Sequence, residues 1–226
     1  MVDYSEIVYE YLAANERLPA VYTFTFKDLT FVGLNKVFSP VIFEDTFFFC
    51  ENIPVKPGDE VLEIGCGTGM IAICLALKGA QVTATDINPH ALINTKVNSI
   101  LNHVEQHVNV FLSDVFAGIN GSIKFDVIFW NTPFIYRSTA TLNLLEASVF
   151  DTEYRSITQY ISKISSFLKE NGRAFLGFSS SSGDAKLLYR ICAEHNIKIR
   201  LYTQSFLSGE GGTDAFSVEM YELIVT

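Results

Sequence analysis

Val61-Leu62-Glu63-Ile64-Gly65-Cys66-Gly67-Thr68-Gly69 is the stretch that decides the fold of this chain. An apolar run ends in an acid, and glycines then follow at every second position. The pattern predicts a strand that runs into a glycine turn, which opens a helix. Glycine permits the sharp turn, and its missing Cβ lets a ligand approach the backbone closely. Turns of this kind bind nucleotide-containing cofactors at the carboxyl end of a parallel strand.

A second acid helps to tell which cofactor such a turn binds. Asp86 ends the next apolar run, 81–86, where its carboxylate can accept hydrogen bonds from two ribose hydroxyls. A nicotinamide site would use the same geometry, but its fingerprint requires Gly or Ala three residues after the second glycine. Met70 occupies that position and is too large for close packing of the helix on the strand. A glycine turn that merely packs a helix remains an alternative.

The G-x-G-x-G turn, with Glu63 before it and Asp86 at the end of the second strand, resembles the class I S-adenosylmethionine-dependent methyltransferases. The resemblance implies a methyltransferase whose cofactor is S-adenosylmethionine and whose product is S-adenosylhomocysteine. It also implies a Rossmann-like α/β fold. In that fold a mostly parallel seven-stranded sheet with an antiparallel last strand is covered by helices on both faces. A nicotinamide-dependent oxidoreductase is a distant alternative.

Composition sets further limits. At 226 residues the chain fits one domain with a short extension. Its net charge of −9 argues against broad nucleic-acid binding, which needs clustered Lys and Arg. No cysteine pair has C-x-x-C spacing, so no metal site is expected. The N-terminus lacks signal-peptide features, and the longest apolar run, 70–77, is too short to span a membrane. We therefore expect a cytoplasmic protein; the sequence leaves its oligomeric state open.

The periodicity divides the chain into an N-terminal extension, 1–55, and a methyltransferase domain, 56–226. The extension is expected to hold a helix over 4–12, a hairpin of 21–26 with 29–32, and a helix over 41–53. The domain alternates strands and helices, which predicts βαβ units and a parallel sheet. Its expected strands are 60–65, 81–86, 107–113, 125–131, 173–179, 197–206 and 215–225; its expected helices are 69–78, 89–101, 152–170 and 184–194. The last two strands, joined by 207–212, should pair as a hairpin.

Polar residues end four of these strands. Ligands of open α/β sheets bind at the carboxyl ends of the strands, so Glu63, Asp86, Asp114 and Asn131 should converge on one crevice. Asp126 differs, because it precedes an apolar strand, and we expect it to cap or pair structurally.

Asn131-Thr132-Pro133-Phe134 resembles the [N/D]-P-P-[Y/F] signature of methyltransferases that modify an amide nitrogen or an exocyclic base amine. The resemblance implies that the Asn131 side-chain oxygen and the Thr132 carbonyl accept both hydrogens of a planar NH₂, while Phe134 packs on the substrate. Thr132 replaces the first proline of the signature, which removes a fixed φ but keeps the carbonyl. The alternative is an Asn-Thr-Pro turn that ends a strand.

The segments 37–40 and 44–47 are similar to the region just before the fold in HemK-type protein-glutamine methyltransferases and the wider small methyltransferase group. The resemblance implies that the Thr46 hydroxyl lies near the methionine end of the cofactor. It further implies that Glu63 and the glycine turn hold that end, Asp86 the ribose, and Asp114 with Val115 the adenine. The full set of candidate cofactor-binding residues is Thr46, Glu63, Gly65, Cys66, Gly67, Gly69, Asp86, Ile87, Asn88, Asp114, Val115 and Asn131; the candidate catalytic residues are Asn131, Thr132, Pro133 and Phe134.

The expected activity is N-methylation of a planar amide or amine, with a protein glutamine side chain as the favoured acceptor. Two alternatives stay open. One is a small-molecule acceptor, which the phenylalanine-rich first fifty residues and Thr132 favour. The other is a cofactor-binding subunit that needs a partner for activity.

Overall fold

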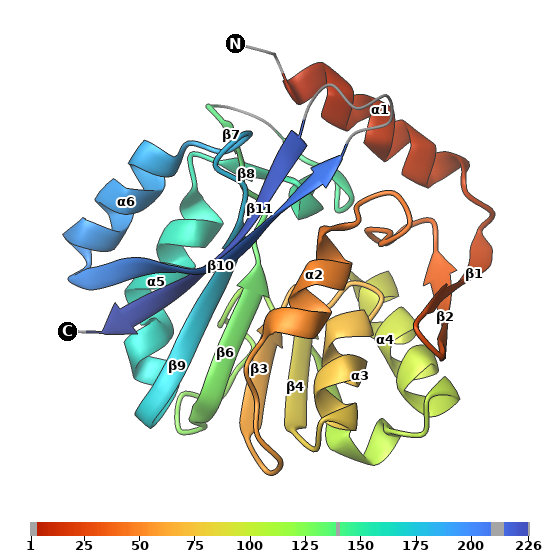
Figure 1. The fold of residues 1–226 in the computed structure, drawn as a ribbon, viewed down its shortest axis with the longest axis horizontal. Coiled ribbons are helices and arrows are strands. Elements are labelled where there is room, and N and C mark those ends of the chain that lie inside the picture. Colours follow the sequence, from red (N-terminus) through yellow and green to blue (C-terminus); the bar gives the residue numbers. More distant parts are fainter. Residues whose placement is uncertain (1–3, 139–140, 209–214, 226) are drawn as a thin grey trace.

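The computed structural model describes residues 4–138, 141–208 and 215–225. At its centre is a seven-stranded sheet of order β10-β11-β9-β6-β3-β4-β5 (Figure 1). Its strands are β3 (Glu60–Ile64), β4 (Gln81–Asp86), β5 (Val108–Leu112), β6 (Phe125–Asn131), β9 (Leu168–Phe178), β10 (Ile197–Ser208) and β11 (Ala215–Val225). Strand β11 runs antiparallel to both its neighbours, and the other pairs are parallel. This confirms the predicted mostly parallel sheet with an antiparallel last strand.

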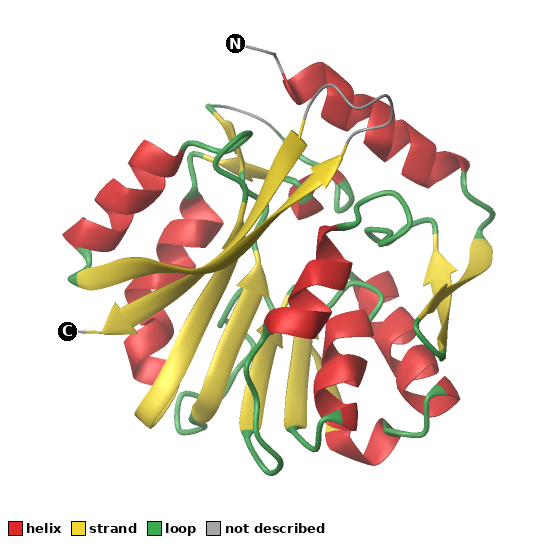
Figure 2. Cartoon of the chain, viewed as in Figure 1, coloured by secondary structure: helices red, strands yellow, loops and turns green. Residues whose placement is uncertain are grey.

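Both faces of this sheet are covered by helices, as Figure 2 shows. Successive residues of a strand point to opposite faces of the sheet. In β3 the successive residues Val61 and Leu62 are both apolar. Val61 packs in one core cluster with α2 (Asp45–Asn52) and α3 (Met70–Leu77), and α4 (Pro89–Leu101) adds Leu92 to that cluster. Leu62 packs in the other with α5 (Arg155–Phe167) and α6 (Ala185–Glu194). Continuous apolar strands are the sequence signature of such doubly covered sheets.

Most element boundaries match the prediction within a few residues, but three elements differ. The predicted helix 4–12 extends to Arg17. The predicted helix 41–53 begins only at Asp45. The predicted helix 152–170 ends at Phe167, and β9 starts directly after it. In that first part of β9, Leu168 pairs with Phe125 before a register shift, and Asn171 has a positive φ of 65°. Periodicity cannot separate the end of this helix from the start of β9, because the apolar spacings of a helix end and of a strand start overlap. The predicted 207–212 turn lies mostly outside the described residues.

The N-terminal residues form α1 (Tyr4–Arg17) and a hairpin of β1 (Val21–Phe26) with β2 (Leu29–Leu34). Buried asparagines on α4 attach the hairpin to the rest of the molecule. Asn98 accepts from Val32 N at 2.7 Å and donates to Val32 O at 2.8 Å, and Asn94 Nδ2 also donates to Val32 O at 2.7 Å. These side chains satisfy the outer edge of β2 as a further strand would.

A short parallel pair, β7 (Ile135–Arg137) with β8 (Phe150–Thr152), was not predicted from the sequence. In Figure 1 this pair lies with α1 at the upper end of the sheet, where the parallel strands end. Apolar residues join the three elements in a small separate core: Val8, Leu12, Ile135, Leu145, Val149 and Phe150. Strands of three residues are too short to give an alternation signal.

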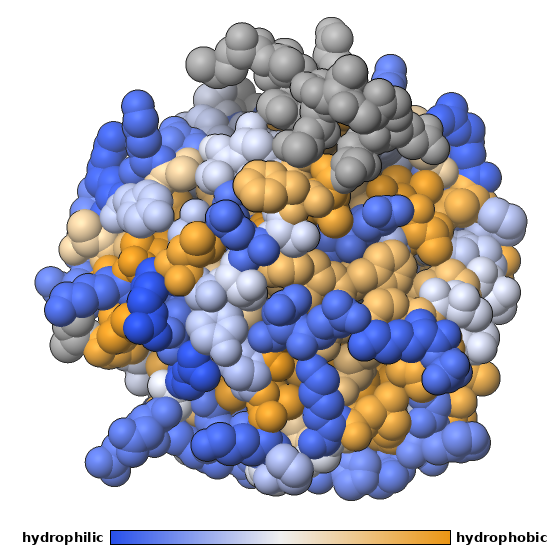
Figure 3. Space-filling model, in the orientation of Figure 1, coloured by the Kyte–Doolittle hydropathy of each residue, from blue (hydrophilic) through white to orange (hydrophobic). Residues whose placement is uncertain are grey.

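Part of the molecular surface is apolar. Figure 3 shows hydrophobic residues gathered over the part of the visible face where α2 lies. Phe47 and Phe48 of α2 are partly buried and pack against the core cluster beneath. Among the described residues, no helix has the length and hydropathy that a membrane span requires.

Candidate functional site

A cavity of about 160 Å³ lies at the carboxyl ends of strands β3 to β6. It brings together residues that are far apart in the sequence, as the strand-end argument predicts. Twelve of the candidate residues line it: Thr46, Glu63, Gly65, Cys66, Gly67, Asp86, Ile87, Asn88, Asp114, Val115, Asn131 and Pro133. The other three, Gly69, Thr132 and Phe134, are not among its lining residues.

The glycine turn has the backbone that its sequence demands. Gly65, Gly67 and Gly69 have φ values of 68°, 54° and 78°, a region that side chains with a Cβ rarely adopt. The space around them differs. A Cβ on Gly67 would meet nothing closer than 3.9 Å, whereas one on Gly69 would lie 2.7 Å from Thr95 on α4. Gly67 therefore keeps the cavity open, and Gly69 lets helices α3 and α4 pack closely.

Glu63 has a buried carboxyl group without a full set of hydrogen-bond partners. It is 1% exposed, and its Oε2 has no hydrogen-bond partner among the described residues. Burial raises the pKa of Glu63 well above its usual value, the charge of Asp86 raises it further, and a hydrogen bond from the Ala72 backbone lowers it. A buried carboxylate oxygen without a donor is costly. The site thus fits a ligand that brings a cation or N–H donors to Glu63.

Asp86 at the end of β4 is already held by the backbone. Its Oδ2 accepts from Gly67 N at 2.9 Å, and its Oδ1 accepts from Asn88 N at 2.8 Å. Burial raises the pKa of Asp86, and these two hydrogen bonds lower it. A carboxylate has about four acceptor sites, so capacity remains for two hydroxyls of a ribose. The two backbone hydrogen bonds fix the carboxylate of Asp86, so its remaining acceptor positions face the cavity that Asp86 lines.

Asn131 at the end of β6 meets a residue that sequence reasoning did not select. Its Nδ2 donates to Asp45 Oδ2 at 2.8 Å, while its Oδ1 is buried and has no partner among the described residues. Asp45 is 5% exposed, and burial raises its pKa to about 6. The sequence offered a weak signal, since Asp45 directly precedes Thr46, but nothing in it links residues 45 and 131.

Thr132 and Phe134 support this strand end from behind. The Thr132 hydroxyl donates to Gly177 O at 2.7 Å, and Thr132 N donates to the same oxygen at 3.3 Å. The hydroxyl thus restrains the loop where the family signature has a proline. Phe134 is half-buried and packs against Phe178 and Phe216. Asp126 is structural, as predicted: its Oδ2 accepts from Glu60 N and from Lys169 Nζ, each at 2.8 Å.

Several further residues line the cavity and were not among the candidates. They come from the segment after β2 (Val37, Phe38 and Pro40) and from the β7–β8 connection (Leu144, Ala147 and Ser148). Asn15 on α1 positions the first segment: its Nδ2 donates to Val37 O at 3.1 Å, and its Oδ1 accepts from Ser39 N at 2.9 Å. The N-terminal residues therefore form part of the cavity wall.

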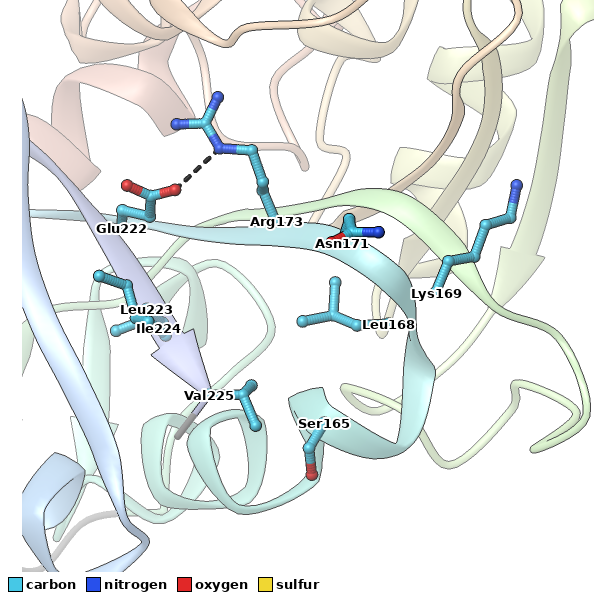
Figure 4. A pocket seen from close by; sticks show the side chains of 10 residues that line it. Ser165, Leu168, Lys169, Asn171, Arg173, Glu222, Leu223, Ile224 and Val225 are labelled. Carbon is cyan, nitrogen blue, oxygen red and sulfur yellow. Dashed lines mark hydrogen bonds and ion pairs between the residues drawn. The ribbon is translucent and has the colours of Figure 1, made fainter.

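A second hollow, of about 300 Å³, lies at the other end of the sheet, near the start of β9. Figure 4 shows its lining, in which Arg173 pairs with Glu222 at 2.8 Å. Its other charged group, Lys169, pairs with Asp126 at 2.8 Å and with Glu60 at 3.2 Å. The hollow lies away from the strand ends where the candidate residues meet. We regard it as a surface feature.

Comparison with known proteins identifies relatives. The family model of the methyltransferase small domain matches residues 28–197. A Methanocaldococcus jannaschii protein assigned as a protein N5-glutamine methyltransferase is 33% identical over 69% of this chain and 79% of its own length. The release factor glutamine methyltransferase of Fusobacterium nucleatum is 30% identical over 68% of this chain, which spans 45% of that protein. Ribosomal RNA small subunit methyltransferase C of Haemophilus influenzae is 32% identical over 66% of the chain and 41% of its own length.

Solved structures agree on the fold. The ribosomal protein L11 methylase of Lactobacillus delbrueckii has a TM-score of 0.57 at 17% identity, over 90% of this chain and 81% of its own. A methyltransferase crystallised with S-adenosylhomocysteine has a TM-score of 0.65 at 12% identity, over 91% of this chain and 57% of its own. The glycine turn agrees with a methyltransferase of this kind, as does Glu63 Oε2, which has no hydrogen-bond partner in the described part of the chain. The family match over 28–197 shows that the chain belongs to the methyltransferase small domain family and is an S-adenosylmethionine-dependent methyltransferase.

Proposed function

We propose that this enzyme methylates a planar NH₂ nitrogen, with a protein glutamine side chain as the favoured acceptor. The observation that carries the proposal is the Asn131 amide oxygen, which is buried, has no hydrogen-bond partner within residues 4–138, 141–208 and 215–225, and belongs to a residue that lines the cofactor cavity. An unsatisfied acceptor there suits a ligand that donates N–H hydrogens. The names of two relatives, both glutamine methyltransferases, support the same acceptor.

Each cofactor-binding residue has a role that fits its side-chain or backbone chemistry. Glu63 and the glycine turn hold the methionine end, with the Thr46 hydroxyl near it, and Asp86 holds the ribose. Asp114 and Val115 lie against the adenine. When bound, S-adenosylmethionine supplies a methyl group on a sulfonium, which is already activated for transfer.

Asn131 and Thr132 act by positioning the acceptor. The Asn131 Oδ1 accepts one hydrogen of the NH₂ and the Thr132 carbonyl accepts the other, so the nitrogen lone pair is directed at the methyl group. Phe134 packs near the substrate plane. Alignment of this kind lowers the activation free energy of a reaction by about 7 kcal/mol or more when the reacting groups are well oriented. No strong base is needed, because an alkylated amide nitrogen readily sheds its extra proton.

The acceptor side is formed by the N-terminal extension, residues 1–55, and by the β7–β8 region that packs on α1. The remainder, from residue 56, is the methyltransferase domain. The small core of these elements gives the acceptor a largely apolar approach. The net charge of −9 disfavours an RNA acceptor, although several relatives are ribosomal RNA small subunit methyltransferases.

The test is transfer of labelled methyl from S-adenosylmethionine into a size-fractionated lysate by the wild type and by Asn131→Ala. We expect label in protein, as N5-methylglutamine after digestion, and about a hundredfold lower rate for the variant. Affinity for S-adenosylhomocysteine should stay unchanged.

Other outcomes assign other functions. Label in RNA indicates a base amine, and label only in small molecules indicates a metabolite acceptor. Cofactor binding without any transfer by the isolated chain indicates a subunit that needs a partner. An Asn131→Ala variant as active as the wild type rules out the NH₂-positioning mechanism.

A further inference from the structure

Asp45 and Asn131 form a side-chain contact across 86 positions of sequence. Asp45 is the first residue of α2, and Asn131 is the last residue of β6. Both oxygens of the buried carboxylate are engaged: Oδ1 accepts from Thr46 N at 3.0 Å, and Oδ2 accepts from Asn131 Nδ2 at 2.8 Å. Asp45 itself is not among the residues that line the cavity.

This contact decides which end of the Asn131 amide faces the active site. An asparagine side chain has nearly the same shape either way round, with an acceptor oxygen at one end and a donor NH₂ at the other. A carboxylate only accepts, so the NH₂ must turn toward Asp45 and the oxygen must turn away. Glycine at position 177 makes room for that oxygen, because a Cβ there would lie 2.9 Å from Asn131 Oδ1.

We infer that Asp45 is a positioning residue that selects the acceptor: by fixing the Asn131 amide, it makes the site admit a nitrogen that carries hydrogens and reject a bare oxygen acceptor. The inference rests on the proposed function and deepens it. The site is built to receive a donor, and an analogue without N–H hydrogens leaves the Asn131 oxygen unsatisfied. Such a mismatch discriminates strongly, by about 10⁴-fold in comparable hydrogen-bonding sites.

The substitution Asp45→Asn changes the orientation of the Asn131 amide while it keeps the size of the side chain at position 45. Its oxygen must stay on Thr46 N, because a backbone N–H cannot reverse, so its NH₂ faces Asn131. The Asn131 amide then flips and presents its NH₂ to the acceptor site. We expect kcat for an amide acceptor to fall about a hundredfold with unchanged affinity for S-adenosylhomocysteine. Glu44→Gln, at the exposed neighbouring position, is the matched control and should keep the wild-type kcat.

The double variant Asp45→Asn with Asn131→Asp again places a hydrogen-bond acceptor at the acceptor site. The NH₂ at position 45 now donates to the carboxylate at position 131, whose second oxygen again faces the acceptor. Activity of the double variant above that of Asp45→Asn supports the inference, since a purely structural role predicts no recovery from a second change. A double variant no more active than the single one, or a fully active Asp45→Asn, overturns it.

A second readout does not depend on the acceptor. In ¹⁵N-labelled protein with S-adenosylhomocysteine, the Asn131 side-chain NH₂ signals are assigned by their loss in Asn131→Asp. Donation to a charged carboxylate should move one proton downfield in the wild type, and Asp45→Asn should abolish that shift. Unchanged signals overturn the inference even if amide methylation is established. The expected shift in an enzyme that methylates no amide would instead refute the proposed function and leave the fixed orientation standing.

Discussion

Glu63 and Asp86, at the ends of neighbouring strands β3 and β4, line one cavity, and the charge of Asp86 raises the pKa of Glu63. Burial is the larger cause of that shift. The protein without its cofactor therefore holds in its interior an incompletely hydrogen-bonded carboxyl group whose charged form burial disfavours. Such an arrangement trades stability of the empty enzyme for affinity toward a ligand that supplies donors.

Glu63→Gln should stabilise the empty enzyme and weaken cofactor binding. Because the folded pKa of Glu63 is raised, its contribution to stability is present below the unfolded value and is lost as pH rises through the folded one. The neutral variant escapes that loss, so its Tm at pH ~8 should exceed that of the wild type. Losing a charge-assisted hydrogen bond should weaken cofactor affinity about ten- to hundredfold.

Thermal melts with and without S-adenosylhomocysteine measure both effects. Glu60→Gln, on the exposed start of the same strand, is the control and should change neither quantity. A Glu63→Gln variant with wild-type affinity would remove Glu63 from the cofactor site.

Asp45 should give the protein a measurable pH-dependent stability. Its folded pKa of about 6 lies above the ordinary value of 3.8, so the folded state binds the proton more tightly. Stability due to this group is full below the unfolded pKa and falls as pH rises through ~6, by about 2 kcal/mol between pH ~4.5 and ~7.5. Urea unfolding of the wild type and Asp45→Asn at both pH values isolates this loss from those of Glu63 and Asp86. Equal pH dependence in the two proteins would contradict the raised pKa.

Gly177→Ala should reduce methyl transfer more than it reduces cofactor binding. The new Cβ would lie 2.9 Å from Asn131 Oδ1 and 2.6 Å from the Phe49 ring, so the side chain beside the acceptor site must move. Overpacking of this kind costs about 1–3 kcal/mol of stability. We expect kcat to fall at least tenfold, as for about 1.4 kcal/mol of lost alignment. Gly121→Ala is the control, because nothing lies within 4 Å of a Cβ there; equal kcat values would show that Asn131 tolerates the contact.

Asn98→Ala should loosen the N-terminal hairpin and the glycine turn together. The buried amide bonds both backbone groups of Val32 and also donates to Thr68 O at 2.8 Å. Removing it takes this partner from Val32 N and Thr68 O, whereas Val32 O keeps its bond from Asn94 Nδ2, and the loss should cost about 2–4 kcal/mol. The cofactor-induced rise in Tm should shrink as well, since Thr68 lines the cavity. Asn102→Ala, which loses a more exposed bond to Thr30 O, should cost about 1 kcal/mol or less.

The candidate site was predictable wherever chemistry follows a strand end directly. Glu63, Asp86, Asp114 and Asn131 could be found because each ends an apolar run, and strand ends of a parallel sheet meet at one edge. Asp45 could not be found in this way, because it lies at the start of a helix in the N-terminal region. The cavity wall formed by Phe38 and Leu144 was equally hidden, since neither belongs to the alternating pattern.

The sequence by itself determined the order of the strands of the central sheet and of the helices between them, the glycine turn and the acids that follow the strands. These are consequences of short-range periodicity and of backbone conformations open only to glycine. Tertiary structure alone decided that Asp45 reaches Asn131, that the β2 edge is satisfied by asparagines of α4, and that α1 packs on β7 and β8. These contacts join residues tens of positions apart. They form because buried polar groups need hydrogen-bond partners, and the packing of the chain decides which partners lie near.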